Sequence, residues 1–323
     1  MLQLFTGGIM LAVDYNNKIS IREAFGKKLA SLGHKNPNIV VLDADLSCST
    51  QTKFFAKEFP ERFFNVGIAE QNLISTASGL AVEGKIPFAA TFAVFATGRT
   101  YDQIRSSVCY QNANVKIIGT HGGITVGEDG ATHQALEDIS LMRGLPNMTV
   151  IVPADANECE QAIEFASTHN GPVYVRISRA NTPVVYSDNY KFDPYKASVL
   201  KEGKDLTIIS NGDILIEACK AVEVLAQKGI NAELISMPVV KPIDMQSIIN
   251  SARKTGKVFT VENHSIYGGL GSAVAEVLSE NLPTKVIRIG MNDEFGQSGT
   301  PEELLKHYKL DAEGIVDRIL SVK

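Results

Sequence analysis

The 323-residue sequence lacks the features of several broad classes of protein. No apolar run reaches the roughly 20 residues that a membrane-spanning helix needs. A net charge of -5 and a pI near 5.8 leave no basic surface for nucleic acid or for an anionic membrane. We therefore expect neither nucleic acid nor a membrane among the partners of this chain.

The sequence also has few cysteines and no Lys or Arg near its N-terminus. The cysteines form no C-x-x-C pair and no zinc spacing, so we expect small buried side chains in a reducing, cytoplasmic setting for Cys48, Cys109, Cys159 and Cys219. No Lys or Arg precedes Lys18, so the apolar start lacks the charged region of a signal peptide. Residues 1–18 are expected to be a loose extension, with Met10 a better start than Met1.

Short apolar runs alternate with segments of helical spacing along the rest of the chain. Runs at 39–42 and 173–177 are typical of buried strands, and segments such as 19–32 and 70–82 are typical of amphipathic helices. Such alternation predicts an α/β fold made of parallel sheets with helices on both faces. The chain length suggests about two such domains in tandem.

A polar stretch with two prolines and no clear period interrupts this alternation after residue 181. Stretches of this kind commonly connect domains. We expect a first domain at 19–185, a linker at 186–204 and a second domain at 205–323.

The segment 120–134, T-H-G-G-I-T-V-G-E-D-G-A-T-H-Q, carries the densest chemistry in the chain. It follows the apolar run 115–119, which reads as a buried strand. Its glycines permit tight turns and close approach to a ligand, while two histidines and two carboxylates supply donors, acceptors and proton carriers. In an open α/β sheet, such a loop at the carboxyl end of a strand predicts a ligand crevice.

Four further motifs are G-I-A-E-Q-N at 67–72, T-F-A-V-F at 91–95 with Y-D-Q at 101–103, G-E-D-G-A-T-H-Q at 127–134, and S-R-A-N at 178–181. The chain resembles the transketolases, which are thiamine diphosphate enzymes, in these four motifs. They occur in the order of that family, and the resemblance extends from about residue 20 to the end. It implies a pyrimidine-binding domain and a C-terminal domain of a transferase that moves a two-carbon ketol unit from a ketose phosphate to an aldose phosphate.

The G-D-G motif with which this family holds the cofactor's diphosphate and Mg²⁺ is missing from the sequence. Glu128-Asp129-Gly130 imitates it, but that segment already matches another motif. The resemblance therefore implies the C-terminal subunit of a split transketolase. A homodimer of this chain would join two N-terminal subunits in a 2+2 heterotetramer, and the partner, not this chain, would hold Mg²⁺.

The resemblance also assigns cofactor contacts. Glu70 would bond the pyrimidine ring of thiamine diphosphate and promote the carbanion chemistry of the cofactor. By its position alone, Glu70 could equally be a solvated glutamate at a helix N-terminus. The other matching positions on the cofactor side are Asp45, Leu46, Ile68, Phe92 and Phe95. Gly98 departs from transketolases that have a further aromatic residue there.

On the substrate side, the resemblance implies a phosphate site and a set of polar contacts to the sugar. The phosphate-binding positions are Arg22, Ser49, His121 and Arg179. Arginine suits a phosphate because its planar fork donates two hydrogen bonds. Asp129 would contact a substrate hydroxyl, and His133 would shuttle a proton near the carbonyl oxygen.

Three other functions stay open. A 1-deoxy-D-xylulose-5-phosphate synthase uses the same cofactor and shares G-I-A-E-Q and Y-D-Q, but tends to have Arg where His121 stands. The β subunit of a 2-oxo-acid dehydrogenase lacks G-E-D-G-x-T-H-Q. A non-catalytic assembly subunit would not need Glu70 or His133.

A second glycine-rich segment, 268–273, follows an apolar run and begins a helix, as a dinucleotide-binding turn does. The residue at its third small position is Val274, and no acidic residue ends a strand about twenty residues later. We interpret this segment as a tight turn that binds no nucleotide.

Overall fold

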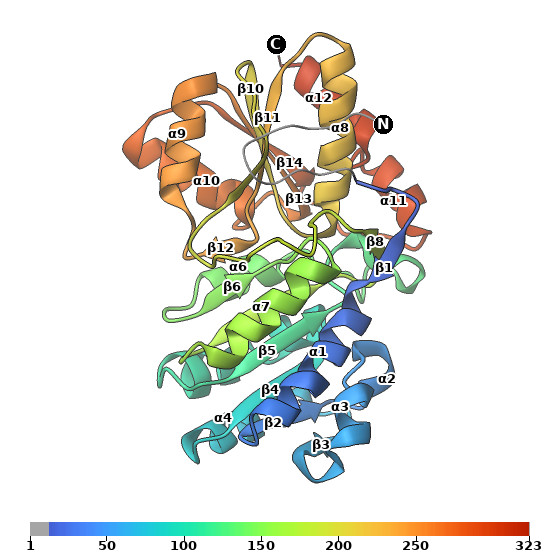
Figure 1. Cartoon of the computed structure of the whole chain (residues 1–323), viewed down its shortest axis with the longest axis vertical. Helices are drawn as coiled ribbons and strands as arrows, with labels where there is room; N and C mark the ends of the chain where they lie inside the picture. The colour runs from blue at the N-terminus through green and yellow to red at the C-terminus, as the bar shows by residue number, and fades with distance from the viewer. Residues whose placement is uncertain (1–12, 323) are drawn as a thin grey trace.

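The first half of the chain is built on a seven-stranded sheet, seen in the lower part of the computed structural model, which describes residues 13–322 (Figure 1). The strand order is β12-β6-β7-β5-β4-β2-β3, and all neighbours are parallel except β12 and β6. The strands are β2 (Ile39–Asp43), β3 (Phe63–Asn65), β4 (Ile86–Phe92), β5 (Lys116–Thr120), β6 (Thr149–Ile151), β7 (Val173–Ile177) and β12 (Val239–Lys241).

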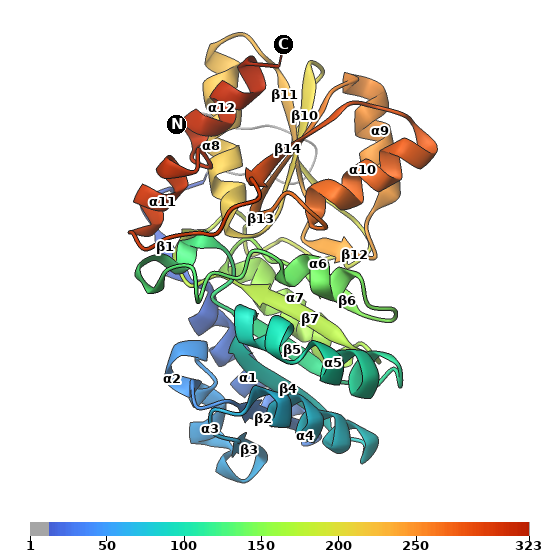
Figure 2. The same ribbon diagram turned by 180° about the vertical axis from the view of Figure 1, so that it is seen from behind.

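Helices cover both faces of this sheet, because alternate strand residues face opposite sides. Val41 and Phe88 pack beneath α1 (Ile21–Lys35) and α7 (Ala156–Thr168), whereas Leu42 and Ala89 pack beneath α4 (Glu70–Val82) (Figures 1 and 2). The shorter helices of this half are α2 (Ser47–Thr50), α3 (Lys53–Glu58), η1 (Pro60–Arg62) and α6 (Asp138–Arg143).

The segment that follows β4 is not a single regular helix. It consists of the π-helical η2 (Phe95–Arg99), the short α5 (Tyr101–Gln103) and the π-helical η3 (Ile104–Cys109). Thr97 and Thr100 donate their hydroxyls to the carbonyls of the residues four positions earlier, at 2.8 and 2.5 Å. Such side-chain bonds compete with the backbone ladder, and π-helical turns often lie at functional sites.

The second half contains a five-stranded sheet with the order β14-β13-β10-β11-β9, in which only β9 is antiparallel to its neighbour. Its strands are β9 (Ser198–Lys201), β10 (Leu206–Ser210), β11 (Ala232–Ser236), β13 (Val258–Ser265) and β14 (Val286–Met291). The helices are η5 (Gly212–Ile214), α8 (Leu215–Gln227), α9 (Met245–Thr255), α10 (Leu270–Asn281), α11 (Pro301–His307) and α12 (Ala312–Leu320). The predicted α/β fold with two sheets is confirmed, and each sheet carries one antiparallel edge strand.

One strand of the second half in sequence, β12, binds the halves together. β12 belongs to the second half in sequence but extends the first sheet beyond β6, at the junction of the halves (Figure 1). The pair β1 (Lys18–Ser20) and β8 (Asn181–Pro183) forms a separate antiparallel ribbon. The segment 186–204, expected as a linker, contains β9, a strand of four residues that is too short to show a period in the sequence.

Three smaller expectations concern the chain ends and surface. Most of the expected extension, residues 1–12, lies outside the described residues, and β1 begins at Lys18. The cysteines are all free, but Cys48 is exposed, so its predicted burial is wrong; it lies in the loop-like α2. Between residues 13 and 322, no helix is both long and apolar enough to cross a membrane.

Candidate active site

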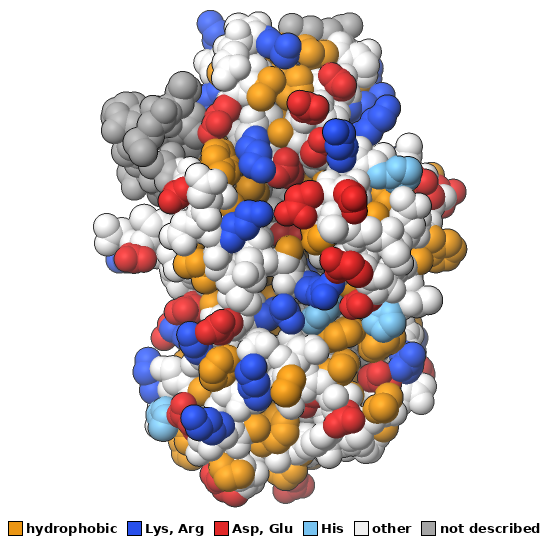
Figure 3. Space-filling model, turned by 90° about the vertical axis from the view of Figure 1, so that its right-hand side faces the viewer, with side chains coloured by type: hydrophobic (Ala, Val, Ile, Leu, Met, Phe, Trp, Pro, Cys, Tyr) orange, Lys and Arg blue, Asp and Glu red, His pale blue; other side chains and the backbone are white. Residues whose placement is uncertain are grey.

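Polar and aromatic residues gather where β2, β4 and β5 end. Asp45 to Ser49 follow β2, Phe92 closes β4, and the glycine-rich segment begins at the end of β5. Because these parallel strands are neighbours in the order β5-β4-β2, their carboxyl ends meet at one edge of the sheet. On this side of the molecule, histidine, basic and acidic side chains gather at mid-height, with hydrophobic side chains below them (Figure 3).

Two phenylalanines and two histidines form an aromatic cluster at this edge. The ring of Phe92 stacks on that of His121 with centroids 3.8 Å apart, and on that of Phe95 at 5.9 Å. The ring of His133 meets Phe95 edge-on at 5.5 Å. The structure thus brings together two residues of the T-F-A-V-F motif and two of the segment 120–134, and their rings form an aromatic wall suited to a flat heterocycle.

Glu70 is the first residue of α4, and its side chain is only 4% exposed. Its Oε1 accepts a hydrogen bond from Nη1 of Arg99 at 2.8 Å. The guanidinium carbon of Arg99 lies 4.5 Å from the centroid of Phe95. Arg99 therefore joins Glu70 to the aromatic cluster. Sequence reasoning missed it, although its position four residues after Phe95 places the two on one helical face.

The imidazole of His121 is buried, and its Nδ1 lies 2.9 Å from Oγ1 of Thr120. Burial lowers the pKa of His121 to about 3, and the charges of Arg22 and Arg179 and the nearby His133 act in the same direction. The ring is therefore neutral at physiological pH. A neutral imidazole can donate from one nitrogen and accept at the other.

Arg22 and Arg179 bring positive charge to the same region. Nη1 of Arg22 donates to the carbonyl of Ser49 at 2.7 Å, while its buried Nε has no hydrogen-bond partner within residues 13–322. Burial, and then repulsion by Arg179, lowers the pKa of Arg22. Arg179 donates to the carbonyl of Val126 and to Oε2 of Glu128, the latter at 2.8 Å. An anion between the two arginines would relieve their repulsion and satisfy that Nε.

Four predicted site residues lie outside this cluster. Asp45 is exposed and accepts from Nδ2 of Asn65 at 2.8 Å. Ile68 is 81% exposed, and Asp129 is exposed as well. The amide of Leu46 donates to Oδ1 of the buried Asp43 at 2.6 Å. Within residues 13–322, no hydrogen bond, ion pair or ring contact links these four to the aromatic cluster.

The glycine-rich segment is held in place by the second half of the chain. It contains the short helical stretch η4 (Ile124–Asp129), and its first amide, that of Ile124, donates to Oδ1 of Asn263 on β13 at 2.9 Å. Oγ1 of Thr125 donates to Asp213 of η5 at 2.5 Å, and Nε2 of Gln134 donates to the carbonyl of Gln297 at 2.9 Å. These contacts connect positions far apart in sequence, so no sequence pattern identified them.

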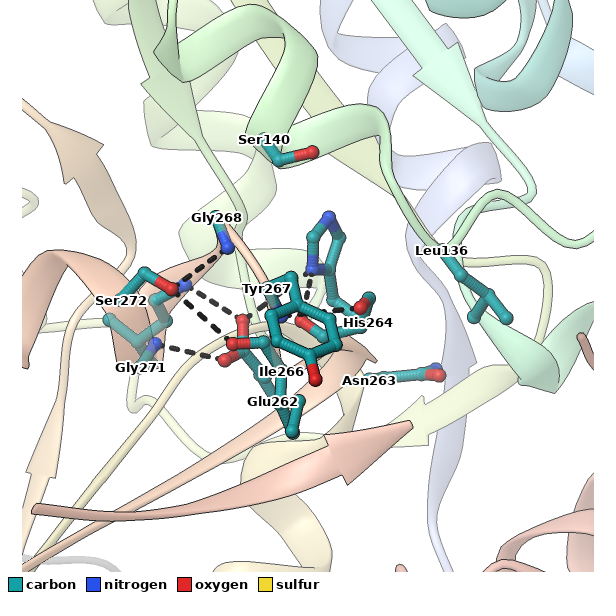
Figure 4. A network of polar contacts seen from close by, with 12 residues as sticks. Leu136, Ser140, Glu262, Asn263, His264, Ile266, Tyr267, Gly268, Gly271 and Ser272 are labelled. Atoms are coloured by element: carbon teal, nitrogen blue, oxygen red, sulfur yellow. Dashed lines mark hydrogen bonds and ion pairs between the residues drawn. The ribbon is translucent and has the colours of Figure 1, made fainter. Parts of the chain in front are cut away.

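In the second glycine-rich turn, residues 268–273, a side chain of the protein itself occupies the backbone amides (Figure 4). The buried carboxylate of Glu262 accepts from the amides of Leu270 and Gly271 at 2.7 and 2.9 Å, at the N-terminus of α10. Burial raises the pKa of Glu262 to about 7, against the lowering effect of these amides. A nucleotide phosphate would need the same amides, and here a side chain of the protein already uses them.

Within residues 13–322, no three His, Cys, Asp or Glu side chains come together in a way that could hold a metal ion. The candidate site thus combines a buried carboxylate, an aromatic wall and two arginines, and its own residues are suited to organic and anionic groups.

Comparison with known proteins places this arrangement in a family. Residues 17–185 match the transketolase pyrimidine-binding domain, and residues 195–315 match the transketolase C-terminal domain. A Methanocaldococcus jannaschii protein described as a transketolase C-terminal section is 52% identical over 93% of this chain and 95% of its own length. The 6-deoxy-6-sulfo-D-fructose transketolase subunit SqwH of a Clostridium species is 43% identical, over 92% of each chain.

A solved structure points to the same family. A split-gene transketolase, described as an inactive β4 tetramer, superimposes with a TM-score of 0.88 at 53% identity and covers 94% of this chain and 98% of its own. The sequence motifs, the aromatic cluster at the sheet edge and both domain matches agree. The chain therefore belongs to the transketolase family, of which it comprises the pyrimidine-binding and C-terminal domains.

Proposed function

We propose that this chain is one subunit of a thiamine-diphosphate-dependent transketolase. It would transfer a two-carbon ketol group from a ketose phosphate to an aldose phosphate, in a site completed by an N-terminal partner subunit. The observation that carries this proposal is the buried carboxylate of Glu70, which Arg99 joins to the Phe95 ring, together with two arginines near His121 of the aromatic cluster.

The cofactor side of the site fits an aminopyrimidine. Glu70 offers a buried carboxylate oxygen to a ring nitrogen, and Phe92 and Phe95 offer ring faces for stacking. Thiamine diphosphate, when bound, supplies the carbanion that accepts the ketol group. Asp45, Leu46 and Ile68 would reach a cofactor from the rim, and the 81% exposure of Ile68 suits a residue that a second chain covers.

The substrate side fits an acyclic sugar with an anionic end. Arg22 and Arg179 would bind the anion, with Ser49 and His121 completing its contacts. Asp129 would accept from a sugar hydroxyl, and His133 would carry a proton at the carbonyl oxygen. The SqwH relative is described as acting on a sulfonated sugar, so the anion at this end is open to either a phosphate or a sulfonate.

The partner would supply what these residues do not. A diphosphate needs Mg²⁺ with oxygen ligands, and residues 13–322 contain no group of side chains suited to that metal. Exposed apolar side chains lie on and around α4, where a second chain would cover them: Phe64, Ile68, Val82 and Tyr110. We propose that two copies of this chain pair there and join two N-terminal subunits about a two-fold axis.

A titration tests the proposal. Calorimetry of the isolated chain with thiamine diphosphate and Mg²⁺ at micromolar concentrations is expected to give no heat of binding and no turnover. Addition of the N-terminal subunit should produce both. Tight cofactor binding or turnover by this chain alone would contradict the shared site, and an assembled complex that binds cofactor without turnover would favour a non-catalytic subunit.

A second assay separates ketol transfer from the synthase alternative. Its motivation is His121, which stands where deoxyxylulose phosphate synthases tend to have Arg. The assembled enzyme should consume a ketose phosphate and an aldose phosphate without release of CO₂. Rapid CO₂ release from pyruvate with glyceraldehyde phosphate would favour the synthase instead.

A further inference from the structure

Arg99 makes two contacts that the proposed function assigns to the cofactor. Its Nη1 donates to Oε1 of Glu70 at 2.8 Å, and its guanidinium carbon lies 4.5 Å from the centroid of the Phe95 ring. An aminopyrimidine protonated at its ring nitrogen would donate from that nitrogen to the same carboxylate and stack on the same ring. The guanidinium is also planar and carries N–H donors at its edge, so it can replace the heterocycle in shape and in hydrogen bonding.

The pairing has a physical reason. The Glu70 side chain is 4% exposed, and a carboxylate that deep is costly to leave without a cation or a donor. Within residues 13–322, the only side chain that forms an ion pair with Glu70 is Arg99. Until a cofactor arrives, Arg99 is therefore the cationic partner that holds this carboxylate in position.

The side chain of Arg99 can also move away from Glu70 and Phe95. Its side chain is 49% exposed, whereas that of Glu70 is 4% exposed and lies in the first turn of α4. It ends the π-helical η2, directly after Gly98, around which the structure leaves open space. The backbone of Arg99 is held separately, because its carbonyl accepts from Nε2 of Gln71 at 3.3 Å. The guanidinium can thus swing into solvent without a change in the backbone.

We propose that Arg99 is an internal placeholder for the aminopyrimidine of the cofactor. It closes the site of the unassembled subunit by occupying Glu70 and Phe95, and the cofactor displaces it when the partner delivers the diphosphate anchor. This inference rests on the proposed function and adds a regulatory contact to it. Occupation of the site by Arg99 lowers the apparent affinity for the cofactor, because only chains whose Arg99 has left the site can bind it.

The test compares Arg99→Gln with the wild-type chain in the complex with the N-terminal subunit. Glutamine removes the charge and shortens the side chain, so it cannot close the site. We expect the calorimetric dissociation constant for thiamine diphosphate, at saturating Mg²⁺, to fall by roughly three- to thirtyfold. The matched control is Arg105→Gln, an exposed arginine on η3 with no ion pair within residues 13–322, which should leave that constant unchanged.

A second measurement uses the free chain and needs no cofactor. Arg99→Gln should lower its melting temperature by a few degrees, because Glu70 loses its partner. The double variant Glu70→Gln/Arg99→Gln should recover most of that loss, since no buried charge remains. Additive effects in this double-mutant cycle would show that the pair does not form in solution and would overturn the proposal.

An unchanged or weaker affinity for the cofactor in Arg99→Gln would overturn the placeholder proposal as well, because Arg99 would then be neutral or helpful to binding.

Failure of the proposed function gives a different result. In that case the wild-type complex itself would bind no thiamine diphosphate, while the double-mutant cycle in the free chain would still report on the pair.

Discussion

Asn263 on β13 donates from Nδ2 to Oγ1 of Thr125 at 3.0 Å, across the junction between the two halves. The same side chain accepts from the amide of Ile124 and donates to Asp213. Gly123 completes the fit, since a Cβ there would lie 2.4 Å from the Asn263 side chain. One residue of the C-terminal domain therefore fixes the start of the loop that carries Asp129 and His133.

Replacement of Asn263 by alanine should loosen this loop. It leaves the Ile124 amide and the Asp213 carboxylate buried with fewer partners, which costs about 1–3 kcal/mol of unfolding free energy. Chemical denaturation of the free chain measures that loss, and limited proteolysis should show faster cleavage between residues 121 and 134. Asn250→Ala, at an exposed position on α9, is the control. Equal cleavage rates in the two variants would rule out this role.

Glu70→Gln tests the residue assigned to the cofactor. In the assembled enzyme, the amide cannot act as the carboxylate does, and turnover should fall by roughly 10²- to 10⁴-fold. Circular dichroism of the variant should match that of the wild-type chain, because the amide has nearly the same shape. Turnover close to that of the wild type would refute the assignment.

Arg22→Gln tests the proposed anion site. Loss of a charged hydrogen bond to the substrate should raise KM by about 10- to 100-fold, with a smaller change in kcat, because the contact exists before and during the reaction. Initial rates of the assembled enzyme measure both constants. The control is Arg253→Gln, at an exposed position on α9. A fall in kcat at constant KM would instead place Arg22 at the reacting centre.

Glu158 predicts a pH dependence of stability. Burial, and then the charge of Asp155, raises its pKa from 4.5 to about 8, although it accepts from the Ala154 amide and the Tyr190 hydroxyl. Because the folded state binds the proton more tightly, Glu158 contributes its full stability below pH 4.5. That contribution declines as the pH rises toward 8, with a slope of about 1.4 kcal/mol per pH unit.

Glu158→Gln should therefore flatten the decline. Unfolding free energies of both chains between pH 5 and 8 measure the difference, which isolates Glu158 from Glu262 and Lys116, whose pKa values of about 7 lie in the same range. Glu83→Gln, at an exposed position after α4, should keep the wild-type slope. Parallel profiles for Glu158→Gln and the wild type would disprove the assignment.

Local signals in the sequence predicted much of the fold. Serine is a favoured N-cap residue, and the hydroxyl of Ser20 accepts from the Glu23 amide at 3.2 Å at the start of the helix predicted near 19–32. The helix 70–82 and the strand 173–177 begin and end as their spacing indicated. In these elements, burial pattern, capping and propensity agree, so a short stretch of sequence contains the whole signal.

Contacts that depend on distant parts of the chain could not be predicted in this way. β12 joins β6 although about ninety positions separate them, and Asn263 reaches Thr125 across 138 positions. Neither residue type nor spacing marks such a pair. Only the family resemblance assigned His121 and Phe92 to one site, and Arg99 lies between T-F-A-V-F and Y-D-Q without belonging to either.

β12 also has a consequence for the order of synthesis. A ribosome releases the first domain before residues 239–241 exist, so β6 emerges with one unpaired edge. Free strand edges invite pairing with other chains. The nascent first domain therefore remains exposed to aggregation until well into the second, and a fragment cut at the linker would keep that open edge permanently. Expression of the two domains as a single polypeptide closes it.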